Sequence, residues 1–257
     1  MENLSYIHPD AKIGKDVTIS PFVTIYEDVV VGDGTYIHPN VTLYPGARIG
    51  KNCQIFPGVT VAAVPQDLKF KGEYTTAEIG DNTTLRECVT VHRGTASKGR
   101  TIVGSNCLIM AYCHVAHDCE LGNNLIISNA TQLAGEVVVD DNAVIGGGTL
   151  VHQFTHIGSY TMIQGGTLVN KDIPPYVMAA RSPVSFVGLN IVGLRRRGFS
   201  NELIATIQEM YRRIFNSDYN MTDALKSIEA ELPASPERDY VLNFIRSSER
   251  GVIKGLR

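Results

Sequence analysis

Residues 103–126 read VGSNCL, IMAYCH, VAHDCE and LGNNLI, four consecutive units of six residues that each begin with an aliphatic side chain. The same step of six, counted from Ile7 to Val169, meets 28 positions, of which 25 are Ile, Leu or Val. An α-helix would repeat its apolar residues about every 3.6 positions and a β-strand about every 2, so neither accounts for this pattern. Repeats of six residues are typical of a parallel β-helix, and the sequence therefore predicts that fold.

The fifth position of each unit is small or β-branched, so we expect the first and fifth side chains to point into the core. Four of the five cysteines occupy this fifth position: Cys53, Cys107, Cys113 and Cys119. A metal cluster is one interpretation of these cysteines. The repeat favours another, in which they are small buried core residues, as free cysteines often are. The odd number of cysteines also argues against a disulfide framework.

This pattern resembles the left-handed parallel β-helix of the hexapeptide-repeat acyltransferases. The handedness is implied by the resemblance alone, since general chirality rules favour right-handed crossovers. The resemblance also implies that three units form one triangular coil. Residues three units apart would then stack at the usual strand spacing of about 4.7–4.9 Å.

The composition excludes several function classes. The chain has 257 residues, and its 23 Lys and Arg against 26 Asp and Glu give a net charge of −3, without the basic excess of a general nucleic-acid binder. No uninterrupted apolar run reaches the ~18 residues of a membrane span. The polar start at residues 1–10 contains no apolar signal segment. We therefore expect a cytoplasmic protein with no membrane span.

The repeat is interrupted twice and then ends. Residues 62–78 and 92–102 lack the six-residue pattern and are expected to be loops that leave the β-helix. After Val169 the pattern stops, and the apolar residues of the tail fall at helical spacing. We expect a β-helix domain over 1–190 and a small α-helical C-terminal domain over 191–257, which would cover the open end of the β-helix.

The tail carries helix signals and most of the local basic charge. Candidate N-caps are Ser200, Thr222 and Ser235. Residues 193–257 hold 11 Lys and Arg against 9 Asp and Glu, a net charge of +2, so the rest of the chain carries −5. Three consecutive arginines at 195–197 are the densest basic cluster. They are either a contact for phosphate or an acidic protein, which Arg suits, or a solvated surface run.

One outward-facing column contains candidate catalytic residues. His117 takes the third position of its unit and should face outward, where an imidazole titrates near neutrality and can act as a general base. Asp118 follows it and is a candidate to orient the ring. With three units per coil, Gly135 and Gln153 lie one and two coils away in the same column, and a glycine N–H there is free to stabilise an oxyanion. The alternative is a set of ordinary surface residues beside a corner aspartate.

Seven stretches make the resemblance more specific. They are PQDLKFKGE (65–73), ECVTVHRGT (87–95), YCHVAHDC (112–119), LAG (133–135), VHQF (151–154), KDIPPYV (171–177) and GLRRRGFS (193–200). Together they span nearly the whole chain. They are similar to the bacterial acyl-carrier-protein-dependent UDP-N-acetylglucosamine O-acyltransferases, the family that performs the first step of lipid A biosynthesis.

The resemblance implies a role for each matching residue. His117 would be the general base toward the sugar 3-hydroxyl, Asp118 its partner acid and Gly135 the oxyanion donor. Further matches are substrate contacts: Gln66, Asp67, Lys69, His114, His152, Gln153, Asn190, Arg196 and Arg197. Gly165 matches a position where side-chain size limits acyl length, so a glycine there implies a long 3-hydroxyacyl chain.

The resemblance also implies how the enzyme works as a whole. A (3R)-3-hydroxyacyl group would pass from acyl carrier protein to UDP-N-acetylglucosamine without a covalent acyl-enzyme. The family is a homotrimer with active sites between subunits, and the resemblance implies no metal and no cofactor beyond the phosphopantetheine of the carrier protein. Two positions depart from the family pattern, since many relatives have His at Glu136 and an acid at Val192.

Three other functions stay open. A γ-type carbonic anhydrase would need three histidines at a metal, for which His92, His114 and His117 are candidates, although the last two take different positions in their units. A structural or ice-binding β-helix would need a flat outward array of threonines, whereas many repeat threonines here take the inward fifth position. A sister acyltransferase would use a coenzyme A thioester or an amino acceptor.

Overall fold

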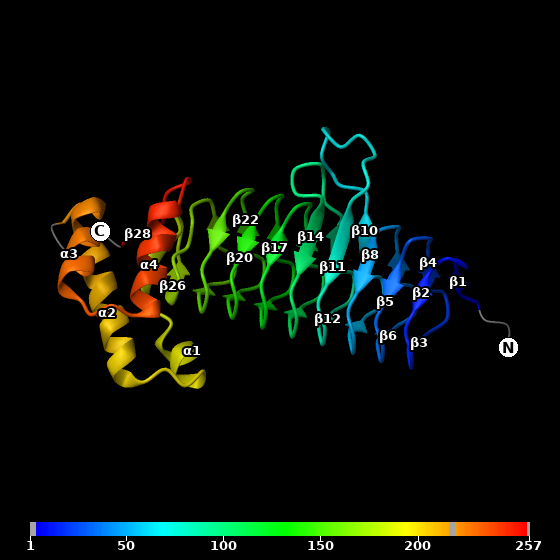
Figure 1. The fold of residues 1–257 in the computed structure, drawn as a ribbon, viewed down its shortest axis with the longest axis horizontal. Helices are drawn as coiled ribbons and strands as arrows, with labels where there is room; N and C mark the ends of the chain where they lie inside the picture. The colour runs from blue at the N-terminus through cyan, green and yellow to red at the C-terminus, as the bar shows by residue number, and fades with distance from the viewer. Residues whose placement is uncertain (1–3, 216–218, 256–257) are drawn as a thin grey trace.

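The computed structural model describes residues 4–215 and 219–255, which form a stack of short coils with helices at one end (Figure 1). The chain enters at the opposite end of the stack. Strands of successive coils pair in parallel and build three long sheets. The structure is therefore the parallel β-helix that the six-residue repeat predicts.

Each sheet takes one strand from almost every coil. The first sheet has nine strands: β1 (Tyr6–Ile7), β4 (Thr24–Ile25), β7 (Thr42–Leu43), β10 (Thr60–Ala63), β13 (Thr90–His92), β16 (His114–Val115), β19 (Gln132–Leu133), β22 (Leu150–Val151) and β25 (Leu168–Val169). The second has eight: β2 (Lys12–Ile13), β5 (Val30–Val31), β8 (Ala47–Ile49), β11 (Thr76–Ile79), β14 (Arg100–Val103), β17 (Glu120–Leu121), β20 (Val138–Val139) and β23 (His156–Ile157). The third has eleven: β3 (Thr18–Ile19), β6 (Tyr36–Ile37), β9 (Gln54–Ile55), β12 (Thr84–Leu85), β15 (Leu108–Ile109), β18 (Ile126–Ile127), β21 (Val144–Ile145), β24 (Met162–Ile163), β26 (Val177–Ala180), β27 (Ser185–Leu189) and β28 (Lys254–Gly255).

The register confirms that one coil is three units long. Val115 of β16 pairs with Leu133 of β19, and Leu133 pairs with Val151 of β22. Each partner therefore lies three units further along the chain. The chain turns between sheets at three rows of corners. We call these the first corner (first to second sheet), the second corner (second to third sheet) and the third corner (third to first sheet).

The core is the row of first and fifth positions, as predicted. From Ile25 to Val169, every aliphatic residue at the first position is at most 3% exposed. The first coil, with Ile7 and Ile13, is only half-buried because no coil covers it on one side. The four cysteines at fifth positions are buried and free, and Cys88 is exposed. Their interpretation as small core residues is confirmed.

Corner residues explain why the units contain Asn, Asp and Gly. Residues at the fourth position adopt positive φ, for example 53° at Asn52 and 57° at Asn106. Asn and Asp tolerate this left-handed conformation because their short polar side chains bond locally. Glycines at the second position lie under the next coil. A Cβ on Gly32 would come within 2.6 Å of the backbone of Gly50.

Both interruptions are shorter than the sequence predicts. The connections occupy residues 64–75, here the first loop, and 93–99, here the second loop. The predicted bounds of 62–78 and 92–102 were too wide, because the chain leaves and rejoins the β-helix as strand. The extended ends pair with one another, as in Thr76–Ile79 of β11 against Arg100–Val103 of β14.

The tail contains four helices: α1 (Ile191–Arg196), α2 (Asn201–Phe215), α3 (Met221–Glu231) and α4 (Pro236–Ser247). The short α1 was not predicted. Two predicted caps are confirmed, since Ser200 Oγ accepts from Leu203 N–H (3.2 Å) and Ser235 Oγ from Arg238 N–H (3.1 Å). Thr222 was wrong. The cap of α3 is the earlier Asn220, whose side chain accepts from Asp223 N–H at 2.9 Å.

The helices cover the C-terminal end of the β-helix (Figure 1). Their apolar residues belong to one hydrophobic core with those of the coils, and the hydroxyl of buried Tyr211 donates to Pro175 O at 2.6 Å. Strand β28 returns from the tail to pair with β27. The division into two domains at residue 190 stays a prediction. Within the described part of the chain, the helices are too short or too polar to cross a bilayer.

The buried row predicts a large stability difference between neighbouring positions. Ile55 is fully buried, whereas Gln54 beside it points outward. We expect Ile55→Ala to lower the free energy of unfolding by about 2–5 kcal/mol, because it leaves a cavity that the stacked coils cannot fill. Gln54→Ala should change it by less than about 0.5 kcal/mol. Urea denaturation measures both, and equal losses would contradict the inward assignment.

Candidate active site

A groove of about 470 Å³ runs along the outer face of the first sheet and its first corner. Strands β16, β19 and β22 supply residues to it, and the first loop reaches it through Gln66. Five of the predicted site residues line this groove: Gln66, His114, His117, Gly135 and Gln153. The three-unit coil therefore brings together side chains that the sequence separates widely.

His117 and Asp118 form a hydrogen-bonded pair at the first corner. His117 Nδ1 lies 2.8 Å from Asp118 Oδ2, and the His117 side chain is 17% exposed while that of Asp118 is fully buried. Because a carboxylate only accepts, we assign the proton to Nδ1, which leaves Nε2 as an acceptor. The fourth-position φ of 58° at Asp118 turns the chain so that these adjacent side chains meet.

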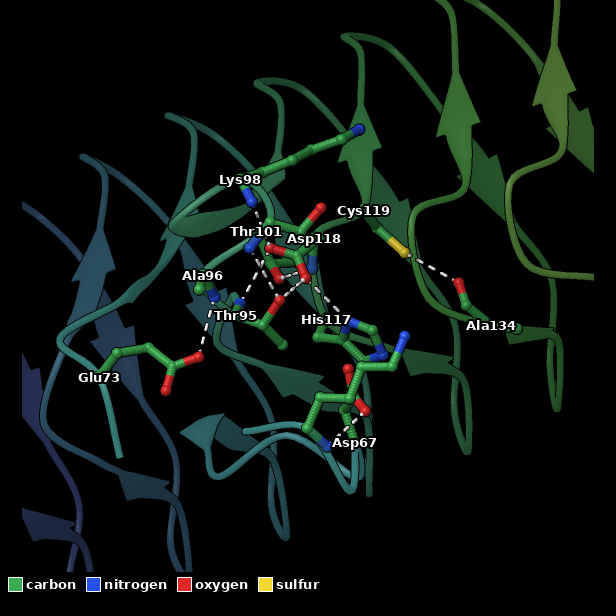
Figure 2. Close-up of polar contacts among 12 residues, drawn as sticks. Asp67, Glu73, Thr95, Ala96, Lys98, Thr101, His117, Asp118, Cys119 and Ala134 are labelled. Atoms are coloured by element: carbon green, nitrogen blue, oxygen red, sulfur yellow. Dashed lines mark hydrogen bonds and ion pairs between the residues drawn. The ribbon is translucent and has the colours of Figure 1, made fainter. Parts of the chain in front are cut away.

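The second loop holds the Asp118 carboxylate in place (Figure 2). Thr95 donates to it twice, through its N–H (2.9 Å) and its hydroxyl (2.7 Å), and Lys98 N–H donates at 3.2 Å. The Asp118 N–H donates to Thr101 Oγ1 at 2.8 Å. Sequence reasoning missed Thr95, Lys98 and Thr101. The lapse of the repeat at residue 97 was the available signal, but it marked a loop without showing its target.

These contacts set the charge state of Asp118. Burial by itself raises the pKa of the Asp118 carboxyl, but the hydrogen bonds from Thr95, His117 and Lys98 outweigh burial and hold the pKa below its ordinary value. The carboxylate is therefore ionised at neutral pH. An ionised acid on Nδ1 fixes the ring orientation and stabilises an imidazolium if Nε2 takes a proton.

Gly135 lies directly against the His117 ring. A Cβ on Gly135 would come within 2.6 Å of His117 Cε1 and Nε2, so a side chain there would displace the ring. Gly135 is buried, and its N–H donates to no acceptor among the described residues. A backbone N–H beside a groove that has no protein acceptor is available to a bound ligand. The predicted column of His117, Gly135 and Gln153 is present.

Two further histidines contact each other here, His114 on the groove lining and His92 behind it. His114 Nδ1 is 2.7 Å from Thr90 Oγ1, and its ring packs edge-on against His92 with centroids 4.6 Å apart. Burial, followed by the nearby His114 and His117, lowers the pKa of His92 to about 4, so this buried ring is neutral at neutral pH. Burial also lowers the pKa of His114.

These histidines do not converge as metal ligands. Across the described ranges, no three His, Cys, Asp or Glu side chains form a group that could hold a metal ion, and this includes His92, His114 and His117. Within one chain, the residues required by the carbonic anhydrase alternative are close together without the geometry of its metal site.

Comparison with known proteins identifies the family. The family described as UDP-N-acetylglucosamine O-acyltransferase, domain 2, matches residues 172–253, and the bacterial transferase hexapeptide repeat matches 28–63 and 100–135. A Chlorobium phaeobacteroides protein named acyl-acyl-carrier-protein–UDP-N-acetylglucosamine O-acyltransferase is 56% identical over 95% of this chain and 93% of that protein. A UDP-N-acetylglucosamine acyltransferase structure from Bacteroides fragilis is 56% identical, with a TM-score of 0.96 over 99% of this chain and 100% of that chain.

The chain belongs to the UDP-N-acetylglucosamine O-acyltransferase family. It is an acyltransferase, and its fold is the left-handed parallel β-helix of these structures, as the resemblance implied. A second solved relative, from Acinetobacter baumannii, is 40% identical, with a TM-score of 0.94 over 98% of this chain and 99% of that chain.

In this acyltransferase, three predicted contacts lie near the groove without lining it. Asp67 and Lys69 follow Gln66 in the first loop, where the Asp67 carboxylate accepts from Lys69 N–H at 2.9 Å. His152 is exposed beside Gln153 and its Nδ1 lies 3.0 Å from Gln153 O.

The predicted nucleotide contacts of the acyltransferase lie at the second corner, away from His117. Asn190 caps α1, and its side-chain amide donates to Tyr160 O at 2.9 Å. Arg197 donates to the side chain of Asn142 and lies over the Tyr160 ring, while Arg196 is exposed. One chain therefore does not bring these residues to the groove.

The acyl-length position lies at the third corner. Gly165 is exposed, and a Cβ on it would come within 2.9 Å of Gly147 O, one coil earlier.

Two residues depart from the family pattern, Glu136 and Val192. Glu136 takes the positive-φ corner position after Gly135, and its N–H donates to His117 O at 3.0 Å. That contact uses only backbone and keeps the column in register. Val192 is 62% exposed on α1.

The Asp118 contacts predict an acid-dependent loss of stability. Because the folded pKa lies below the ordinary value of 3.8, the stabilisation is fully present above about pH 4 and is lost as the pH falls through the folded pKa. We expect Asp118→Asn to be destabilised relative to the wild type by more at pH 7 than at pH 2.5, as measured by urea denaturation. Thr95→Val should remove part of the same pH dependence. A difference that stays constant with pH would contradict the assigned contacts.

Proposed function

We propose that this acyltransferase moves a (3R)-3-hydroxyacyl group from acyl carrier protein to the 3-hydroxyl of UDP-N-acetylglucosamine, the first step of lipid A biosynthesis. The observation that carries the proposal is the stack of His117 on Gly135, which both line one groove, with the Gly135 N–H lacking an acceptor among the described residues. The names of relatives that share 56% of the sequence supply the substrates. We place the reaction in the cytoplasm.

His117 is the general base. The ionised Asp118 holds Nδ1–H at 2.8 Å, so the free Nε2 is the acceptor at the groove. Nε2 takes the proton of the sugar 3-hydroxyl as the oxygen attacks the acyl carbon. The imidazolium that forms is paired with a buried carboxylate, which lowers the cost of the charge.

Gly135 supplies the oxyanion donor. As the sugar oxygen adds to the thioester, the carbonyl oxygen gains negative charge, and a fixed backbone N–H stabilises it without reorganisation. Gly135 lines the groove and its N–H lacks an acceptor among the described residues, which suits this role. Only a glycine fits there, because a Cβ would strike the His117 ring.

Transfer is direct. The described residues that line the groove include no serine, threonine or cysteine. Cys119, the cysteine nearest to His117 in sequence, is buried, and burial raises the pKa of its thiol to about 12. The ester C–O bond therefore forms on the sugar while the thioester C–S bond breaks. The proton on His117 passes to the departing phosphopantetheine sulfur, so the two substrates suffice and no cofactor is assigned.

A homotrimer would complete the site. His117, Arg197 and Gly165 lie at three different corners of one chain, although the proposed reaction needs a base, a nucleotide contact and an acyl pocket together. Side-by-side packing of β-helices around a three-fold axis brings different corners of neighbouring subunits together. We infer that Asn190, Arg196 and Arg197 of one subunit serve the groove of another, and that Gly165 leaves room for a long acyl chain.

The base assignment predicts a specific loss of activity. We expect His117→Ala to lower kcat/KM by about 10²–10⁴-fold with purified (3R)-3-hydroxyacyl carrier protein and UDP-N-acetylglucosamine, because no other group takes the proton. His38→Ala, which removes a histidine packed on Phe56 at the third corner, should leave the rate within about twofold. Near-normal turnover of folded His117→Ala would overturn the assignment. No turnover by the wild type would overturn the proposed function.

Direct transfer predicts that the acyl group is never bound to the protein. After incubation with the acyl carrier protein donor and without sugar, intact-mass spectrometry should show the unmodified chain, because no serine, threonine or cysteine lines the groove. Addition of UDP-N-acetylglucosamine to the same sample should then release the acylated sugar. A stoichiometric acyl adduct that disappears on adding sugar would contradict direct transfer.

A further inference from the structure

Glu73, the last acidic residue of the first loop, connects the two loops above the first corner. Its carboxylate accepts from Ala96 N–H in the second loop at 2.9 Å and from Lys71 N–H in its own loop at 2.8 Å. Figure 2 shows Glu73 on the far side of Thr95 and Ala96 from Asp118. None of the functions assigned above uses this residue.

The second loop connects Ala96 to Asp118, so a movement of Ala96 shifts groups that hydrogen-bond to the Asp118 carboxylate. Thr95, next to Ala96, makes two of the four hydrogen bonds to the Asp118 carboxylate. Internal bonds stiffen the loop, since Gly99 N–H donates to Thr95 O (2.8 Å) and Ser97 N–H to Thr95 Oγ1 (3.2 Å). The path from Glu73 to the base is therefore a short series of backbone and side-chain hydrogen bonds.

The first loop touches the groove at its other end. Gln66 lines the groove beside His117, and Glu73 lies later in the same loop. Between them, Phe70 packs under the Arg93 guanidinium at 5.4 Å, and Arg93 in turn donates to Pro45 O at 3.2 Å. The first loop is thus fixed to the second loop at two points and to the groove at a third.

We propose that Glu73 is a positioning residue that couples the first loop to the orientation of the Asp118–His117 pair. A substrate held by the first loop then restrains the second loop through Glu73, and through Thr95 it restrains the base. This inference rests on the proposed function, because it assigns the first loop to substrate and His117 to proton transfer.

The charge of Glu73 suits a permanent link. Backbone hydrogen bonds, led by its own N–H and then that of Lys71, lower the pKa of the Glu73 carboxyl, so it is ionised at neutral pH. One oxygen of the ionised carboxylate accepts from Lys71 N–H in the first loop, and the other accepts from Ala96 N–H in the second loop. A glutamine at this position has a single acceptor oxygen and satisfies one loop only.

Kinetics separate a positioning role from a substrate contact. We expect Glu73→Ala to lower kcat by about tenfold, because the base is held less well, with the KM for UDP-N-acetylglucosamine within about twofold. The kcat of Glu73→Gln should lie between that of Glu73→Ala and that of the wild type. Glu27→Ala removes an exposed carboxylate from the same corner in an earlier coil and should leave both parameters unchanged. A raised KM with normal kcat would overturn the positioning role.

A double-mutant cycle tests the path. If Glu73 acts through Thr95, adding Glu73→Ala to Thr95→Val should lower kcat by a smaller factor than Glu73→Ala lowers it in the wild type, because only the backbone N–H bond of Thr95 to Asp118 is left. Thr95→Ser keeps the hydroxyl and should restore the sensitivity to Glu73→Ala. Losses in kcat that multiply in the double variant would show independent action and would overturn the coupling.

Hydrogen exchange tests the link without any turnover. In Glu73→Ala, the amides of Thr95, Ala96 and Lys98 should exchange at least about tenfold faster than in the wild type, because the second loop opens more often. The amide of Ala134 in the neighbouring coil should not change. Unchanged protection of the three loop amides would overturn the proposal, even if the wild type turns over as proposed. If the wild type shows no acyl transfer but these amides exchange faster in Glu73→Ala, the link between the loops is supported and only the proposed function is overturned.

Discussion

The aliphatic side chain at the first position of each unit can be buried only if another coil lies directly above it, since a single coil of three units has no interior of its own. The structure meets this requirement with parallel strands whose partners are one full coil apart. Fifth-position cysteines, threonines and valines fill the remaining space, and second-position glycines let the coils approach. The helical tail buries what would otherwise be an open end against one continuous core. Each element thus contributes to stability mainly through its neighbours along the stack.

The same stacking produces the proposed active site. Outward residues at a corner do not pack in the core, so they are free to take part in catalysis. The fixed register places residues three units apart next to each other. The pairing of β16 with β19 places His117 over Gly135. Apart from His117, the coils do not supply the hydrogen-bond donors that hold the buried Asp118 carboxylate at the corner. The second loop provides them, through Thr95 and Lys98, and the first loop is tied to it through Glu73.

The repeat allowed the core and the buried cysteines to be predicted, because a strict period determines which side chains share a face. The column of His117, Gly135 and Gln153 also required the coil of three units, which the resemblance implied. The loops follow no period, so their bounds were too wide and Thr95 was not found. The cap of α3 was assigned to Thr222 instead of Asn220, since both residue types cap helices and only the packing of the tail chooses between them. Residues such as Arg197 and Gly165 were assigned by resemblance to one site. The structure places them at other corners of the chain, which the sequence of one subunit does not reveal.

The central claim is that one outward column carries both the base and the oxyanion donor. A crystal structure with the acylated UDP-N-acetylglucosamine product bound tests it most directly. We expect the ester oxygen on sugar carbon 3 within about 3 Å of His117 Nε2, with the acyl carbonyl oxygen facing the Gly135 N–H at about 3 Å. A sugar whose 3-oxygen lies away from His117, or an acyl carbonyl held by another donor, would contradict it.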